Sequence, residues 1–132
     1  MLYLDTSALM KLIRREPESE SLANWLDTQT PAPWVSSRLI EVELPRAVRR
    51  VDPLRLASVP AIAARVALYE IDQVVRAAAA AYPDPALRSS DAIHLATGDA
   101  VFGTLLTAFV SYDERLLAAA AGVGLPTAAP GR

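Results

Sequence analysis

The sequence contains no cysteine, one histidine and one lysine. The absence of cysteine excludes a disulfide framework, a thiol nucleophile and a cysteine-based zinc site. A single histidine excludes a histidine-rich metal site and acid–base cleavage by a histidine pair. No apolar run approaches the roughly 18 residues that a membrane-spanning helix needs, so we expect no membrane partner.

The chain also lacks a large excess of positive or of negative charge. Thirteen basic residues against fifteen acidic ones give a formal net charge of −2. Such a chain does not coat nucleic acid by bulk positive charge, although a local basic patch around a site is compatible with it. Because Asp5 follows only four residues, we expect no secretory signal and a cytoplasmic protein.

The length of 132 residues, 52% of them hydrophobic, predicts one globular domain over residues 1–132, with a frayed tail at residues 128–132. Short apolar runs typical of buried strands alternate with stretches of helical spacing. The predicted strands are residues 2–4, 34–36, 66–69 and 107–110, with a weaker edge strand near Leu125. This alternation predicts an α/β fold, a three-layer α/β/α sandwich around a central parallel sheet of four to five strands.

Local signals indicate how several predicted helices begin and end. Ser7 fits the N-cap of the first helix, and Ser111 with Glu114 matches a capping box before the last. Gly122 suits the C-cap of that last helix. Pro45 falls inside the helix predicted after the second strand and should kink it or break it locally.

The first two predicted helices carry more apolar surface than two short helices need against one sheet. We expect part of this surface to form an exposed groove that accepts an amphipathic helix of a partner protein. The apolar residues concerned are Leu9, Leu12, Ile13, Leu22, Trp25 and Leu26.

Four acidic residues fall near the carboxyl ends of the predicted strands, where open parallel sheets bind ligands. Asp5 directly follows the first strand, and Asp113 comes just after the fourth. Glu43 lies on the helix after the second strand, and Asp91 lies in the first turn of the helix before the fourth. Converging carboxylates repel one another, and a hard divalent cation, Mg²⁺ or Mn²⁺, resolves that repulsion and activates water. The sequence does not decide between one ion and two.

Three of these acids also have a structural explanation. Asp91 stands at a helix start, where the helix dipole favours a carboxylate, and Asp113 lies inside the capping-box segment. Glu43 is compatible with a solvated helix face, with Glu41 close by as an alternative. Asp5 differs, because a charge that closes a buried strand is costly unless it is paired or bound to metal.

Two further polar residues lie near these acids in the sequence. His94 comes three residues after Asp91, and with no second histidine we interpret it as a packed, hydrogen-bonded helix residue rather than a ligand. Arg46 comes three residues after Glu43, at a spacing that lets it lean toward the acids.

Four blocks of sequence together resemble the PIN-domain nucleases, and more narrowly the VapC toxins of bacterial toxin–antitoxin modules. The resemblance covers nearly the whole chain, in order and at suitable spacing. The blocks are LDTSAL at residues 4–9, ELPRA at 43–47, SDAIHLA at 90–96 and VSYDERL at 110–116.

The resemblance implies an endoribonuclease dependent on Mg²⁺ or Mn²⁺. The family's acidic residues correspond to Asp5, Glu43, Asp91 and Asp113, which would hold the metal directly or through water. Thr6 corresponds to the hydroxyl residue after the first acid, and Ser111 replaces the threonine usual before the last. The resemblance also implies a homodimer, or a hetero-oligomer with a VapB-like antitoxin that offers an arginine to the acids.

Two other functions stay open. The same fold would serve as a binding module without turnover, although the presence of all four acids argues against this. A flavodoxin-like phosphoacceptor or phosphatase domain usually needs an acidic pair after the first strand and a lysine near a late strand. Here Asp5 is followed by Thr6 and Ser7, and Lys11 is the only lysine.

Overall fold

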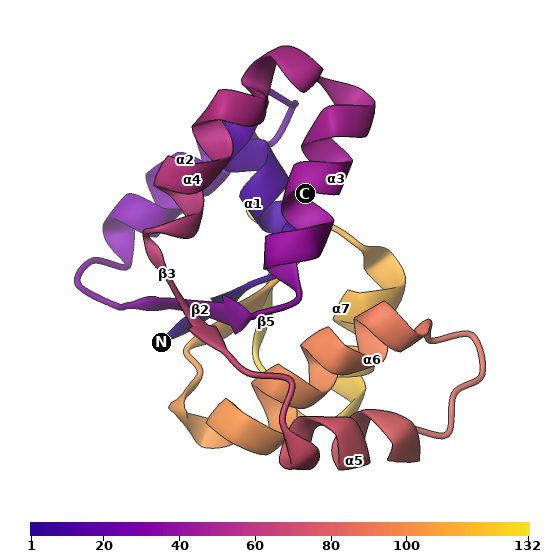
Figure 1. Ribbon diagram of the computed structural model, residues 1–132. Coiled ribbons are helices and arrows are strands. Elements are labelled where there is room, and N and C mark those ends of the chain that lie inside the picture. Colours follow the sequence, from indigo (N-terminus) through magenta and orange to yellow (C-terminus); the bar gives the residue numbers. More distant parts are fainter.

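A computed structural model describes residues 1–132. Five parallel strands form one sheet in the order β3-β2-β1-β4-β5 (Figure 1). They are β1 (Leu2–Leu4), β2 (Trp34–Ser37), β3 (Val66–Tyr69), β4 (Ala108–Val110) and β5 (Thr127–Ala128). The predicted sheet is confirmed, and its fifth strand lies at one edge, two residues beyond Leu125.

Helices cover both faces of the sheet. The α-helices are α1 (Thr6–Ile13), α2 (Ser19–Thr28), α3 (Ile40–Val51), α4 (Val59–Ala63), α5 (Gln73–Ala81), α6 (Ser89–Ala96) and α7 (Glu114–Gly122). Figure 1 shows α1 to α4 on one side of the strands and α5 to α7 on the other. The three-layer α/β/α prediction is confirmed. None of these helices is long and apolar enough to cross a bilayer.

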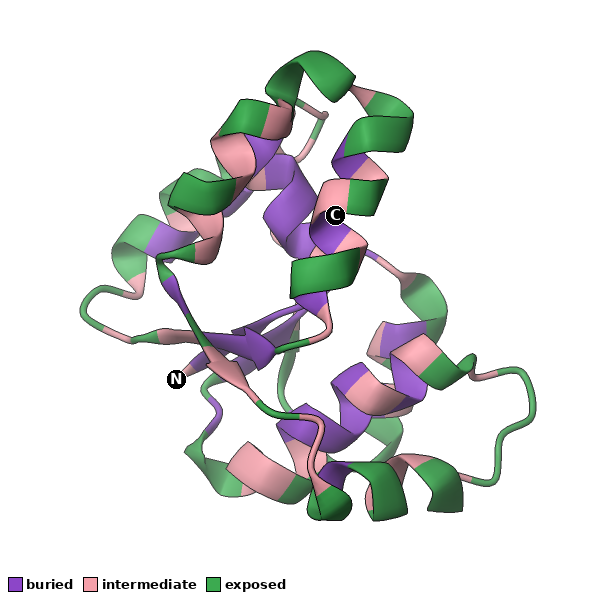
Figure 2. Ribbon diagram, in the orientation of Figure 1, coloured by how far each residue is buried: buried purple, intermediate pink, exposed green.

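The alternation of side chains along β1 divides the core in two. Leu2 and Leu4 pack with the apolar residues of α1, α2 and α3, whereas Tyr3 faces the other layer and packs with α6 and α7. All three are fully buried, and Figure 2 shows the central strands buried beneath helices whose outer sides are exposed. Because β1 is covered on both faces, its next residue leaves the sheet in the middle of the molecule.

Two predicted helix starts are wrong by one or two residues. The N-cap of α1 is Asp5, whose side chain accepts a hydrogen bond from the backbone N–H of Ala8, and Ser7 lies inside the helix. The N-cap of α7 is Asp113, not a box of Ser111 with Glu114. In both places the carboxylate nearer the strand takes the cap, because it reaches the free N–H groups directly.

The interior of α3 and the end of α7 also differ from expectation. α3 continues from Ile40 to Val51 with Pro45 inside it, so the local break does not occur. Proline removes one hydrogen bond to the carbonyl four residues back. That residue is Glu41, which is exposed on the outer side of the helix. α7 includes Gly122 as its last residue, and the left-handed conformation falls on Gly124, at φ 87°.

Four of the six apolar residues of the first two helices are core, so they do not form the exposed groove that we predicted. Leu9, Ile13, Leu22 and Leu26 are at most 7% exposed. Leu12 and Trp25 are only partly buried, but both pack against the same core. The physical reason is that these residues join one core cluster with β1 and α3, and α3 packs against α1. The spacing within two helices does not reveal such contacts.

The chain end is not frayed. Ala128 belongs to β5, and the carbonyl of Pro130 accepts a hydrogen bond of 2.8 Å from the hydroxyl of Tyr112. The guanidinium of Arg132 donates to Glu18 at 3.0 Å and to the backbone carbonyl of Tyr112 at 3.1 Å. Lys11 binds the other oxygen of Glu18 at 2.8 Å. Glu18 therefore ties α1 to the last residue.

The absence of a side chain at Gly98 allows the backbone of the turn after α6 to approach the ring of Phe109 closely. Gly98 lies in a π-helical turn, Thr97–Phe102, that extends α6. A Cβ atom at Gly98 would lie 2.8 Å from the ring of Phe109. That ring in turn stacks on Tyr3, with centroids 4.7 Å apart and planes within 4°. The missing side chain therefore makes room for an aromatic stack in the core.

We expect Gly98→Ala to destabilise the fold by about 1–3 kcal/mol, because the new methyl group must displace a buried ring. Denaturant unfolding measures this change. Gly122→Ala is the matched control, since a Cβ there meets nothing within 4 Å and alanine favours the helix. Equal stability of the two variants would contradict the close approach.

Hydrogen bonds from Lys11 and then Arg132 lower the pKa of Glu18 to about 2, from an ordinary value of 4.5. A depressed carboxyl pKa contributes stability that is present above pH 4.5 and lost as the pH falls toward 2. We therefore expect Glu18→Gln to be less stable than the parent near neutral pH, with the difference shrinking below pH 4.5. Unfolding measured across pH checks this.

Glu20→Gln on the same helix is the control, because Glu20 is exposed and makes no ion pair. A pH-independent difference for Glu18→Gln, or the same profile for Glu20→Gln, would contradict the role of this contact.

Candidate metal-binding active site

The site lies at the topological switch point of the sheet, between β1 and β4. From β1 the sheet is extended to one side by β2 and β3, and from β4 it is extended to the other side by β5. Crevices form at the carboxyl ends of strands at such a point. Asp5 leaves β1 there, and Ser111 leaves the neighbouring β4.

Asp5 is held by hydrogen bonds to both carboxylate oxygens. Its Oδ1 accepts from the backbone N–H of Ala8 at 2.9 Å and from the hydroxyl of Ser7 at 2.7 Å. Its Oδ2 accepts from the hydroxyl of Ser111 at 2.6 Å. Burial raises the pKa of Asp5 above its ordinary value, and the nearby His94 and then these hydrogen bonds oppose that rise. No cation forms an ion pair with it.

Asp91 and Asp113 share the guanidinium of Arg88. Its Nε lies 3.3 Å from Oδ2 of Asp91, and its Nη2 lies 3.8 Å from Oδ2 of Asp113. Oδ1 of Asp113 caps α7 by accepting from the backbone N–H groups of Arg115 and Leu116. Asp113 therefore caps a helix, as the sequence allowed, and its second oxygen faces only the guanidinium of Arg88, at 3.8 Å.

Glu43 is held by one of its two oxygens. Its Oε1 accepts a hydrogen bond of 2.8 Å from the hydroxyl of Thr6 and lies 2.6 Å from Nε2 of His94. Partial burial alone would raise the pKa of Glu43, but the contacts with His94 and Thr6 outweigh it and lower the pKa. His94 is buried and hydrogen-bonded, as its sequence context indicates.

All four predicted acids line one cavity of about 420 Å³. Glu16 is a fifth acid in its wall. Thr6, Ser7 and Ser90 add hydroxyl groups. Four basic residues also line it: Lys11, Arg50, Arg88 and Arg132. The cavity therefore combines carboxylates with positive side chains that suit a substrate carrying phosphate groups.

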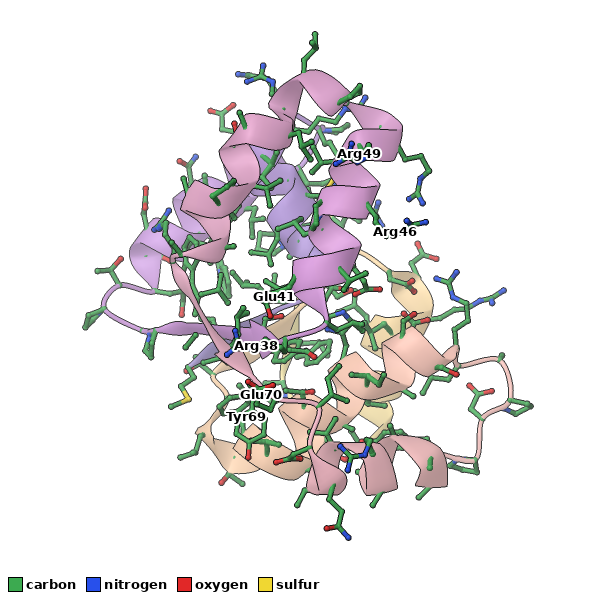
Figure 3. The ribbon with its side chains drawn as sticks, in the orientation of Figure 1. Arg38, Glu41, Arg46, Arg49, Tyr69 and Glu70 are labelled. Atoms are coloured by element: carbon green, nitrogen blue, oxygen red, sulfur yellow. The ribbon has the colours of Figure 1, made fainter.

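The prediction that Arg46 leans toward the acids is wrong. It is exposed and does not line the cavity, and Figure 3 shows it on the outer side of α3 together with Arg49. The arginine that does reach the cavity is Arg50, seven residues after Glu43. Seven residues are almost two full helical turns, so this spacing keeps the two side chains on one face better than a spacing of three.

Sequence reasoning also missed Arg88, Lys11 and Arg132 as cavity residues. Arg88 carried a usable signal, because it precedes Asp91 by three residues at a helix start. Lys11 and Arg132 carried none: they come together through Glu18 and Tyr112, which are neighbours only in the fold.

The donor set suits a hard divalent cation. No three acidic or histidine side chains lie close enough together to ligate a single ion. Mg²⁺, however, usually takes only one or two protein carboxylates and completes its shell with water and substrate phosphates. Four acids spaced around one cavity fit that mode of binding better than an all-protein cage.

Comparison with known proteins identifies the family to which this chain belongs. The sequence profile of the PIN domain matches residues 2–122. The chain is 55% identical to ribonuclease VapC35 of Mycobacterium tuberculosis, over 100% of this chain and 98% of the relative. It is 40% identical to ribonuclease VapC47 of the same organism, over 99% and 98% of the two chains.

A solved structure shares the fold. The crystal structure of Mycobacterium tuberculosis VapC20, a toxin that cleaves the sarcin–ricin loop, matches with a TM-score of 0.75 at 15% identity. The match covers 98% of this chain and 100% of VapC20. The profile, the identities and the five-stranded parallel sheet agree: the chain belongs to the PIN-domain family and, within it, to the VapC ribonucleases.

Proposed function

We propose that the chain is the toxin of a toxin–antitoxin module and hydrolyses RNA phosphodiesters with water activated by Mg²⁺ or Mn²⁺. The observation that carries this proposal is the single cavity at the β1–β4 switch point, lined by Asp5, Glu43, Asp91 and Asp113. The relatives named as ribonucleases over the whole chain support the choice of RNA.

The four acids have different proposed roles. Asp5, Asp91 and Asp113 are the proposed metal ligands, directly or through water, and Glu43 completes the shell or orients the attacking water. The bound ion would neutralise charge on the phosphate and lower the pKa of water. Hydrogen bonds from Ser7 and Ser111 hold Asp5 in place before any ligand arrives, so little reorganisation is needed.

Basic residues supply affinity for the RNA backbone. Arg50 is exposed and unpaired, and Arg88 is 73% exposed at the side chain with only long ion pairs to Asp91 and Asp113. Exposed pairs of this kind are weak. Arg88 is therefore free to exchange a carboxylate for a phosphate, while net charge elsewhere on the chain stays negative.

The proposed regulator is a VapB-like antitoxin that inserts an arginine among the same acids. A guanidinium forms strong charge-assisted bonds with carboxylates in a partly desolvated cavity, so it competes with the metal ion. We also propose that the chain acts in the cytoplasm as a homodimer or in a hetero-oligomer with this antitoxin.

We expect Asp5→Asn to lower RNA cleavage by at least about 100-fold, because it removes the charge of a metal ligand while keeping the shape and the helix cap. Glu43→Gln should also lower cleavage. The assay is cleavage of RNA by the purified, antitoxin-free chain, with EDTA as the metal-free reference.

Glu41→Gln is the matched control on α3. Its carboxylate pairs with Arg38 at 3.3 Å, away from the cavity, as Figure 3 shows. Cleavage that is lost equally in Glu41→Gln and Glu43→Gln would refute the assignment of this helix. Binding of RNA without any metal-dependent cleavage would identify a binding module instead.

We expect saturating Mn²⁺ or Mg²⁺ to stabilise the fold by roughly 1–3 kcal/mol, because an ion that binds only the native state shifts unfolding by mass action. Thermal melts with EDTA and with each metal measure the effect. Asp5→Asn and Asp91→Asn should lose it, and Glu41→Gln should keep it. A melting temperature unaffected by millimolar metal would contradict a preformed site.

A further inference from the structure

A buried chain of hydrogen bonds runs from the core of the sheet to Glu43. The hydroxyl of Tyr3 lies 2.7 Å from Nδ1 of His94, and Nε2 of the same ring lies 2.6 Å from Oε1 of Glu43. Tyr3 is fully buried and His94 is 3% exposed. We propose that Tyr3 and His94 are positioning residues that fix the imidazole as its Nε2–H tautomer and thereby orient Glu43; this rests on the proposed role of Glu43 in cleavage.

If the imidazole of His94 is neutral, only one placement of the protons satisfies this chain of hydrogen bonds. A tyrosine hydroxyl carries its proton at neutral pH, and that of Tyr3 lies within hydrogen-bond distance of Nδ1. An ionised carboxylate only accepts hydrogen bonds, and Oε1 of Glu43 already accepts one from the hydroxyl of Thr6. The Tyr3 hydroxyl then donates to Nδ1, and Nε2–H donates to Glu43. The opposite tautomer would place two acceptors, Nε2 and the carboxylate, 2.6 Å apart.

The consequence for Glu43 is that its two oxygens become unequal. Oε1 receives two hydrogen bonds, from His94 and from Thr6. Oε2 receives none from the chain, although Glu43 lines the cavity. One oxygen is thus an anchor, and the other is left for a water molecule or a metal ion. Fixing a ligand through such contacts is how proteins usually orient carboxylates and imidazoles around metals.

The anchor is rigid because Tyr3 cannot move. Its backbone lies in β1 between β2 and β4, and its ring stacks on Phe109. The same ring meets the edge of His94, with centroids 5.9 Å apart and planes at 81°. The orientation of Glu43, on a helix of one layer, is therefore set by aromatic packing in the opposite layer.

Nuclear magnetic resonance tests the tautomer directly, because His94 is the only histidine. In the ¹⁵N-labelled protein at neutral pH we expect one imidazole with protonated Nε2 and unprotonated Nδ1. Tyr3→Phe should shift the Nδ1 resonance and broaden the tautomer distribution. Tyr82→Phe is the matched control, since its hydroxyl donates to Asp99, away from the cavity. An Nδ1–H tautomer or an imidazolium in the parent would overturn the proposal.

Kinetics test the effect on Glu43. We expect His94→Leu to lower kcat about 10- to 100-fold with little change in KM. His94→Gln should restore much of this loss, because its amide can donate to Glu43 from a similar position. Tyr3→Phe should give a smaller loss in kcat at unchanged KM, with Tyr82→Phe like the parent. A kcat unaffected by Tyr3→Phe and His94→Leu would overturn the positioning role.

The two tests separate this proposal from the proposed function. If the parent cleaves no RNA with Mn²⁺ present, the nuclease proposal fails, and the positioning role in cleavage fails with it even when the tautomer is found. If the parent cleaves RNA but the tautomer is wrong or the variants keep full kcat, only the positioning proposal fails. Thermal melts of each variant identify any loss of fold, and Tyr3→Phe keeps the ring stack if His94→Leu does not fold.

Discussion

The burial of one carboxylate constrains the rest of this site. Asp5 is 4% exposed at the end of a fully buried strand, where an unpaired charge is costly. The chain compensates with hydroxyl and N–H donors rather than with a cation. One donor, Ser111, stands 106 residues away in the sequence and joins the end of β4 to the start of α1. Since Asp113 follows Ser111 by two residues and caps α7, the same contact also places the second acid.

Holding acids with neutral donors has an electrostatic effect. Neutral donors leave the negative charge of Asp5 in the cavity, whereas a buried lysine partner would cancel it. The one lysine in the chain is engaged by Glu16 and Glu18 instead. Positive charge near the acids is supplied mainly by exposed arginine side chains such as Arg50 and Arg88. The result is a site with affinity for a small cation inside and for phosphate at its rim.

The elements that the sequence predicted well are those with a local cause. Buried strands such as Ala108–Val110 are read from short apolar runs, and an acid directly after such a run, like Asp5, falls at the crevice by topology alone. The sequence predicts Ser7 as the N-cap, but aspartate caps helices as readily as serine, so residue type does not distinguish Ser7 from Asp5. Only the strand end, which fixes where the chain turns, decides between them.

The features that the sequence did not predict depend on contacts between distant segments. The core position of Leu22 depends on a cluster of residues from several elements, and the cavity position of Arg132 depends on Glu18. The bond between Tyr3 and His94 joins residues 91 positions apart. No spacing rule within a helix or strand reaches so far. Arg50 is the exception, since the helical period alone places it on the face of Glu43.

The two ends of the chain are unequal as points of attachment. Met1 precedes β1 at the amino ends of the strands, where its backbone nitrogen contacts the carbonyl of Leu105. Arg132 lies at the other end of the sheet and forms part of the cavity wall. A purification tag, fluorophore or surface linker joined to the carboxyl end would therefore stand at the entrance to the site. Immobilisation through the amino end leaves the entrance open to RNA and to a protein inhibitor.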